Sequence, residues 1–220
     1  MLSRLRYFVD RLALMPRYRS KRWCHLRAIR ERDRGGRYQD VLFGLLDLIG
    51  FFDLYEALTN ALTPGIRPLT EGELHFLRPI FGDAVPWHLI RIDERAWLGP
   101  RWGNFCYVTF HTINSWGPMS PPTLVHEVVH AWQYHRVGAA YIPRALAAQR
   151  SVMGYDYGGV APLLQNTCLE DFNYEQQADI IEDAFRLANG YRAQWHGLGM
   201  EVLEVYFRIC GRCGGMIFDI

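Results

Sequence analysis

His126 and His130 stand four residues apart, and Glu127 follows the first of them directly. On an α-helix this spacing puts both imidazoles on one face, so two ring nitrogens can bind a single metal ion. Glu127 lies beside that face, where a carboxylate can take a proton from an activated water without being a ligand. The pattern predicts a zinc centre that hydrolyses a substrate. The competing interpretation is a pair of buried histidines without metal, which would need other hydrogen-bond partners.

The residues before and around this motif predict the helix that it requires. Ser120 or Thr123 can accept hydrogen bonds from free backbone N–H groups at a helix start, and a proline suits the first helical position. The remaining positions are apolar: Leu124, Val125, Val128, Val129, Ala131 and Trp132. We therefore expect a helix that is buried on most sides, with one polar stripe facing a cleft.

A catalytic zinc takes three protein ligands and leaves the fourth position to water, so another donor is expected on a separate element. Asn173 with Gln176 has the pattern of a helix start, and Asn189-Gly190 has that of a helix end. Residues 174–188 are therefore expected to form one helix.

Three carboxylates, Glu175, Asp179 and Glu182, share one face of this expected helix. Like charges arranged in this way repel one another unless a cation lies among them. Glu175 is the preferred third ligand. The competing interpretation is an acidic face exposed to solvent.

The combined pattern, His-Glu-x-x-His followed by Glu-x-x-x-Asp, resembles the gluzincin clan of zinc metallopeptidases. The resemblance implies that His126, His130 and Glu175 are the Zn²⁺ ligands. It also implies that Asp179 is the second-shell carboxylate that orients a ligand histidine. The fold implied is α+β: a zincin-like domain with a small β-sheet packed on the metal-binding helices.

A longer stretch, about residues 69–189, resembles the metallopeptidase-like core of bacterial proteins related to Vgr and associated with contractile injection systems. The likeness rests on Phe110 to Gln133, on Tyr155-Asp156-Tyr157, and on Glu175-Gln176-Gln177-Ala178. It names no substrate.

The expected reaction is hydrolysis of a peptide bond by metal-activated water, with Glu127 as the general base. A donor for the carbonyl oxygen is also needed. Tyr155 and Tyr157, in the glycine-bearing loop between the two expected metal helices, are candidate oxyanion donors, although tyrosines in such loops more often serve packing. His111 is a candidate further ligand, for which a surface or supporting role is preferred.

Two segments, 87–92 and 105–110, alternate apolar and polar residues and are expected to pair as strands. The second of them ends at His111 and is expected to run close to the metal helix. An edge strand there would hold an extended chain by backbone hydrogen bonds, which implies a polypeptide substrate.

The net charge of +1 hides an uneven distribution, because residues 1–39 contain 12 Lys or Arg against three acidic residues. We expect a basic, helical N-terminal appendage over 1–63 and the zincin-like domain over 69–220, joined by a Pro-Gly linker. The appendage is a candidate docking site for a protein assembly. Its arginines could contact an anionic membrane surface or nucleic acid, of which nucleic acid is disfavoured, and its amphipathic pattern could equally pack on its own domain.

The apolar segment 41–63 does not read as a transmembrane span, because Asp47, Asp53 and Glu56 recur within it. We expect these carboxylates at the edge of an otherwise buried helix surface.

Five cysteines and no recognisable secretory signal favour free thiols and a reducing compartment. We therefore predict a cytoplasmic chain, with export without a signal peptide as the alternative. Cys210 and Cys213 form a lone C-x-x-C, for which a structural zinc with Cys24 and His25 is the less favoured interpretation.

The alternative function is a catalytically inactive, zinc-stabilised scaffold, or an effector-associated module of a bacterial secretion system. A fourth protein ligand such as His111 or Glu182 would favour this alternative.

Overall fold

The structure is a computed structural model that describes residues 2–32, 38–97, 100–103 and 105–213. Its contacts divide the chain into two compact units. The first unit comprises Met1–Pro68, Trp87–Pro118 and Gln133–Arg144, and the second comprises Leu69–Pro86, Met119–Trp132 and Ala145–Ile220.

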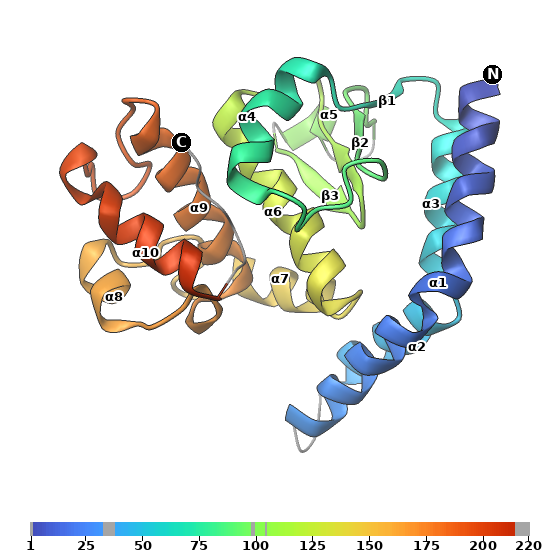
Figure 1. Ribbon diagram of the computed structural model, residues 1–220, viewed down its shortest axis with the longest axis horizontal. Coiled ribbons are helices and arrows are strands. Elements are labelled where there is room, and N and C mark those ends of the chain that lie inside the picture. Colours follow the sequence, from blue (N-terminus) through green and yellow to red (C-terminus); the bar gives the residue numbers. More distant parts are fainter. Residues whose placement is uncertain (1, 33–37, 98–99, 104, 214–220) are drawn as a thin grey trace. The chain divides into compact units, whose positions relative to one another are not determined.

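The first unit combines a helical hairpin, a short helix and a small sheet. Its elements are α1 (Leu2–Arg32), α2 (Tyr38–Leu48), α3 (Phe51–Leu62), β1 (Ile66–Pro68), β2 (Arg91–Asp93), α5 (Pro100–Gly103), β3 (Tyr107–Thr109) and β4 (Thr112–Asn114). The long helix α1 lies along α2 and α3, as Figure 1 shows in blue and cyan. The segment 133–144, which belongs to α6 and α7, completes the unit.

The sheet has four strands in the order β1-β2-β4-β3. Strand β4 pairs with β2 in parallel and with β3 in antiparallel orientation. The prediction that the segments 87–92 and 105–110 pair directly was therefore wrong, because β4 lies between them. A turn at Phe110, whose φ is 58°, reverses the chain after β3 and lets the following residues form β4.

Buried ion pairs join the helices of this unit. The Arg11 guanidinium contacts Asp53 at 3.3 Å and also contacts Glu56, while Arg22 lies 3.1 Å from Asp47 and 2.5 Å from Asp53. All five side chains are less than 9% exposed. Buried charges of this kind are stable only when they are paired and hydrogen-bonded, and each of these carboxylates has an arginine beside it.

This network corrects the expected polarity of α2 and α3. Asp47, Asp53 and Glu56 were expected at the edge of a buried apolar surface, but all three point inward and are buried. Large apolar side chains of the same helices, such as Leu45 and Leu58, are exposed instead. The sequence pattern alone does not show that two arginines of α1 neutralise the acidic side.

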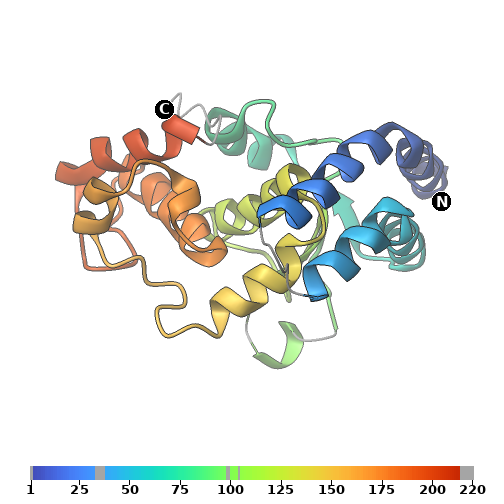
Figure 2. The same ribbon diagram turned by 90° about the horizontal axis from the view of Figure 1, so that it is seen from below.

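The second unit is mainly helical. Its elements are α4 (Glu71–Phe81), the main part of α6 (Pro121–Val137), the end of α7 (Tyr141–Gln149), α8 (Val160–Gln165), η1 (Leu169–Asp171), α9 (Tyr174–Ala188), η2 (Met200–Val202) and α10 (Leu203–Cys213). Helix α10 packs against α9, which Figure 2 shows in red beside orange.

Both helices expected to carry the metal residues are present. The first, α6, begins at Pro121, and the Ser120 hydroxyl accepts from the Thr123 N–H at 3.3 Å. The second, α9, spans Tyr174–Ala188, and Asn173 and Gln176 form the expected reciprocal cap. These local predictions are confirmed.

The α+β class is confirmed, since the described chain is mostly helical with one four-stranded sheet. No described helix combines the length and the apolar character needed to cross a bilayer. The boundary at Leu69 coincides with the expected start of the second domain, whereas 87–118 and 133–144 group with the first unit. The division into a domain 1–63 and a domain 69–220 stays a prediction.

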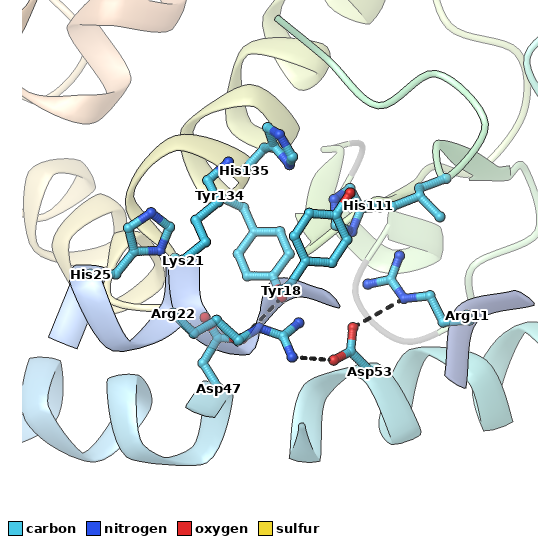
Figure 3. A pocket seen from close by; sticks show the side chains of 12 residues that line it. Arg11, Tyr18, Lys21, Arg22, His25, Asp47, Asp53, His111, Tyr134 and His135 are labelled. Atoms are coloured by element: carbon cyan, nitrogen blue, oxygen red, sulfur yellow. Dashed lines mark hydrogen bonds and ion pairs between the residues drawn. The ribbon is translucent and has the colours of Figure 1, made fainter. Parts of the chain in front are cut away.

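Three histidines, His25, His111 and His135, line a polar cavity of about 30 Å³ in the first unit (Figure 3). Burial, followed by the charge of Arg11, lowers the pKa of His111 to about 4. His111 is thus buried beside Glu56, with Nδ1 3.4 Å from Oε2, and not at the surface as expected.

The pKa of His111 predicts a defined pH dependence of stability. As the pH falls from about 6.5 to about 4, the unfolded chain binds a proton at His111 that the folded chain does not. Relative to His111→Gln, the wild type should then lose up to roughly 3 kcal/mol of unfolding free energy. Urea denaturation followed by circular dichroism at several pH values measures this difference. A His75→Gln variant, at an exposed site on α4, serves as the control. A difference between wild type and His111→Gln that does not change with pH would contradict the buried, neutral imidazole.

Candidate metal centre

Helix α6 places His126 and His130 one turn apart, with ring centroids separated by 5.0 Å. The other sides of the helix are packed, because Leu124, Val125, Val128 and Val129 are almost fully buried. The polar stripe is therefore held in a fixed direction, as the sequence pattern predicted.

Helix α9 brings Glu175 to these two rings. Its Oε2 atom lies 3.4 Å from Nε2 of His130 and 3.6 Å from Nε2 of His126. For metal–ligand bonds of 2.0–2.1 Å, the ligand atoms of a tetrahedral zinc site are about 3.3–3.4 Å apart. The two distances from the carboxylate oxygen are thus close to those that such an ion requires, and the three residues form one group whose ligand atoms all lie within 4.8 Å of one another.

The hydrogen bonds of Glu175 support the same assignment. Gln149 donates to its Oε1 at 2.9 Å, while Oε2 is buried and accepts no hydrogen bond. A buried carboxylate oxygen without a donor is costly, and a cation between it and the two imidazoles would remove that cost. Two imidazole nitrogens and one carboxylate oxygen are also a common ligand set for catalytic zinc, so the residues fit this ion.

The other ring nitrogen of His126 faces two further carboxylates. Nδ1 lies 2.9 Å from Oδ1 of Asp179 and 3.2 Å from Oε2 of Glu182. A carboxylate at this position holds the proton on Nδ1 and leaves Nε2 free for a metal. The structure therefore places Asp179 where the sequence analysis expected it, and Glu182 beside it.

Asp179 is itself held in place from a distant part of the chain. The Trp195 indole N–H donates to Oδ2 of Asp179 at 2.5 Å. The backbone N–H groups of Gln194 and Trp195 donate in turn to Asp183, at 2.5 and 3.5 Å. One side of α9 thus fixes the loop that carries Trp195, and the loop fixes the carboxylate that orients His126.

The charges of the group shift its titration. Burial alone would lower the pKa of His126, but the neighbouring carboxylates of Asp179, Glu175 and Glu182 outweigh it and raise the pKa well above 6.5. Burial opposes a rise for His130 also, and the Glu175 charge overcomes it. Raised pKa values favour the protonated imidazoles, which compete with a metal ion for the same ring nitrogens. The affinity for a metal should therefore increase with pH.

Glu127 is 6% exposed, and its Oε2 has no hydrogen-bond partner. Burial raises its pKa, although the charges of His126 and His130 act in the opposite direction. A raised pKa brings a carboxylate nearer to the value that suits a general base at neutral pH.

The two candidate tyrosines differ. The Tyr155 ring lies 6.2 Å from that of His126 and is 38% exposed, and burial raises its pKa to about 12. Tyr157 is buried, and its hydroxyl bonds to Asp183 at 2.6 Å and to Tyr206 at 2.5 Å. This corrects the prediction of Tyr157 as an oxyanion donor, because its hydroxyl already makes hydrogen bonds inside the core. Tyr155 remains the candidate.

The other predicted ligands lie outside this group. His111 belongs to the first unit and contacts Glu56. Cys24, Cys106, Cys168 and Cys210 are free thiols, and none of them occurs in a metal-ligand group of the described residues. The side chain of Cys213 lies outside the residues whose side chains are described.

Gln149 and Trp195 are the site residues that sequence analysis missed. Each contacts a carboxylate of α9 from 16 to 26 residues away. Neither belongs to a motif with His126 or Glu175, and only the fold brings them together.

No family model matches the chain, and no solved structure matches it. A curated protein does: the type VI secretion system spike protein VgrG2b of Pseudomonas aeruginosa. The two sequences are 27% identical over 138 residues, which is 57% of this chain and 13% of the relative. The chain thus corresponds to a small part of that protein, and a relation to Vgr-associated proteins is supported at this level only.

The contact between Trp195 and Asp179 gives a first test of the metal centre. Trp195→Phe keeps the aromatic ring but removes the N–H donor, so Asp179 should hold His126 less firmly. We expect zinc affinity to fall by about tenfold, at the lower end of the range for residues that support ligands. Titration against a competing chelator measures the affinity. Trp102→Phe, at an exposed position on α5, should leave it unchanged. Equal affinities for wild type and Trp195→Phe would rule out this supporting role.

Proposed function

We propose that the chain is a zinc-dependent peptidase of the gluzincin type. The observation that carries the proposal is the position of Glu175 Oε2, which is buried and lies 3.4 and 3.6 Å from the Nε2 atoms of two histidines one helical turn apart. Among the described residues, the ligand group that contains His130 has three members. Three protein ligands leave one coordination position for water, which is the arrangement of a catalytic site.

Zinc, when bound here, would lower the pKa of a water molecule and polarise the carbonyl of the scissile bond. The remaining steps belong to the protein. Glu127 follows His126 directly in α6, and its unpaired Oε2 can accept the proton of the attacking water. The same carboxyl can then deliver the proton to the leaving nitrogen.

Tyr155 fits the role of donor to the developing oxyanion. Its ring lies near that of His126, it is partly exposed, and its raised pKa keeps the phenol protonated at neutral pH. A protonated phenol near the metal ligands can donate to a substrate carbonyl oxygen. The substrate class that we propose is a polypeptide.

The spike protein to which the chain is similar supports an association with a bacterial secretion system. We propose that the chain is exported by such a system, as part of or together with a protein assembly. A closed metal site would favour the alternative of an inactive scaffold. Glu182 approaches Nδ1 of His126 and not the Nε2 atom that faces Glu175, so it does not close the site of the His130 group.

Two variants test the proposed chemistry separately from metal binding. Glu127→Gln should retain zinc and reduce hydrolysis of a peptide library by at least about 10²-fold, because the general base is lost. Glu175→Ala should lose most of the zinc as well as the activity. Metal analysis of the purified proteins and mass spectrometry of the digested library give both readouts. Zinc binding by wild type without any cleavage would support the scaffold, and full activity of Glu127→Gln would exclude the mechanism.

The role of Tyr155 has a test of its own. Tyr155→Phe should lower kcat by about 10²-fold or more while the zinc content and KM change little, because the hydroxyl acts mainly on the transition state. Steady-state kinetics on a peptide identified in the library separate kcat from KM. A Tyr157→Phe variant should instead lower the melting temperature, since its hydroxyl bonds to Asp183 in the core. An unchanged kcat in Tyr155→Phe would remove this residue from the mechanism.

A further inference from the structure

Helices α2 and α3 have the reverse of the polarity that is usual in a soluble domain. Amphipathic helices normally turn their apolar side inward. Here Asp47, Asp53 and Glu56 point inward, where Arg11 and Arg22 pair with them. The apolar side of the same two helices faces outward.

The outward face, called here the hairpin face, is large and continuous in sequence. Its residues follow helical spacing, and between 38% and 80% of each is exposed: Tyr38, Leu42, Leu45, Ile49, Phe51, Leu54, Tyr55, Leu58 and Leu62. Single exposed apolar residues are common, but so many on two consecutive helices indicate a surface that binds something. No Lys or Arg occurs in 38–62, and its four acidic residues, Asp40 included, are all buried.

Positive charge is exposed on α1, the helix that packs along α2 and α3. The arginines that pair with the buried acids are only two of those in α1, and Arg17, Arg19 and Arg27 remain exposed on the same helix. Arg19 and Trp23 of α1 line an open groove together with Leu48 of α2, so a cation and an exposed indole lie next to the hairpin. Tryptophan and arginine beside an apolar helical face are typical of segments that lie in a membrane interface.

We propose that the hairpin face docks on the surface of a bilayer that contains anionic lipids. The apolar side chains would enter the region below the headgroups, and the exposed arginines of α1 would contact lipid phosphates. With 11 and 12 residues, α2 and α3 are far shorter than the roughly 20 residues that a span requires, so they would lie on the membrane.

Charge disfavours a second copy of the chain as the occupant. Each copy exposes Arg17, Arg19 and Arg27 on α1, and two such surfaces would repel each other. An anionic surface is attracted by the same charges. The proposal concerns the first unit alone and does not depend on the proposed peptidase activity.

Flotation of the full chain with lipid vesicles tests the proposal. The wild type should float with vesicles of phosphatidylcholine and phosphatidylglycerol. The variant L42Q/L45Q/L54Q/L58Q should bind them at least about tenfold more weakly. These side chains are exposed, so circular dichroism and the melting temperature should stay close to those of the wild type. The control L146Q/V152Q/M153Q/L164Q replaces four exposed apolar residues elsewhere and should bind like the wild type.

The charge contribution needs a second pair of measurements. Vesicles of phosphatidylcholine alone, or high salt, should reduce binding of the wild type by about tenfold, and R19Q/R27Q should do the same on anionic vesicles. Equal binding to neutral and anionic vesicles would overturn the proposal. A wild-type chain that binds no vesicles would also overturn it. If sedimentation then showed the wild type to be a dimer and L42Q/L45Q/L54Q/L58Q to be a monomer, the hairpin face would instead join two copies of the chain.

Discussion

A buried carboxylate is stabilised by a positive charge or by hydrogen-bond donors beside it, and both units of this chain place basic side chains beside buried acids. In the first unit, α1 supplies Arg11 and Arg22, whose charge is permanent, to the acids of α2 and α3. In the second unit, the buried oxygen of Glu175 meets only two imidazoles at comparable distance. An imidazole is charged or neutral according to its surroundings.

A buried carboxylate paired with arginine and one paired with histidine therefore differ in what they can do. An arginine stays positively charged over the whole working pH range, so its carboxylate partner needs no other cation. Under the proposed function, the pair His126 and His130 would exchange protons for a metal ion at the same ring nitrogens. The carboxylates of α9 would then act on a bound metal through ring orientation, because Asp179 faces Nδ1 of His126 and fixes the nitrogen that carries the proton.

The parts of the structure that local chemistry decides could be predicted from the sequence. Both metal helices begin at their predicted caps, since capping involves residues only three positions apart. The order of the strands could not be predicted, because β4 is three residues long and follows β3 after a turn at a non-glycine residue. The inverted polarity of α2 and α3 was also missed, because the hydrophobic pattern of a helix shows which face is apolar but not which face is buried. The buried face was decided by arginines that lie 25 to 45 residues away in the sequence. The roles of Gln149 and Trp195 could not be predicted either, because their partners Glu175 and Asp179 are distant in the sequence.

Helix α6 contributes to both units: His126 and His130 lie in its first part, while Tyr134, which stacks edge-on against Phe110 and His111, lies in its last turn. Each residue of an α-helix turns the side chain by about 100°. One inserted or deleted residue between His130 and Tyr134 would therefore swing either the imidazoles or the phenol out of place. Among homologous sequences, insertions and deletions should therefore be absent from this segment and confined to the loops. The constant interval from His126 to Tyr134 can then anchor the alignment of distant relatives.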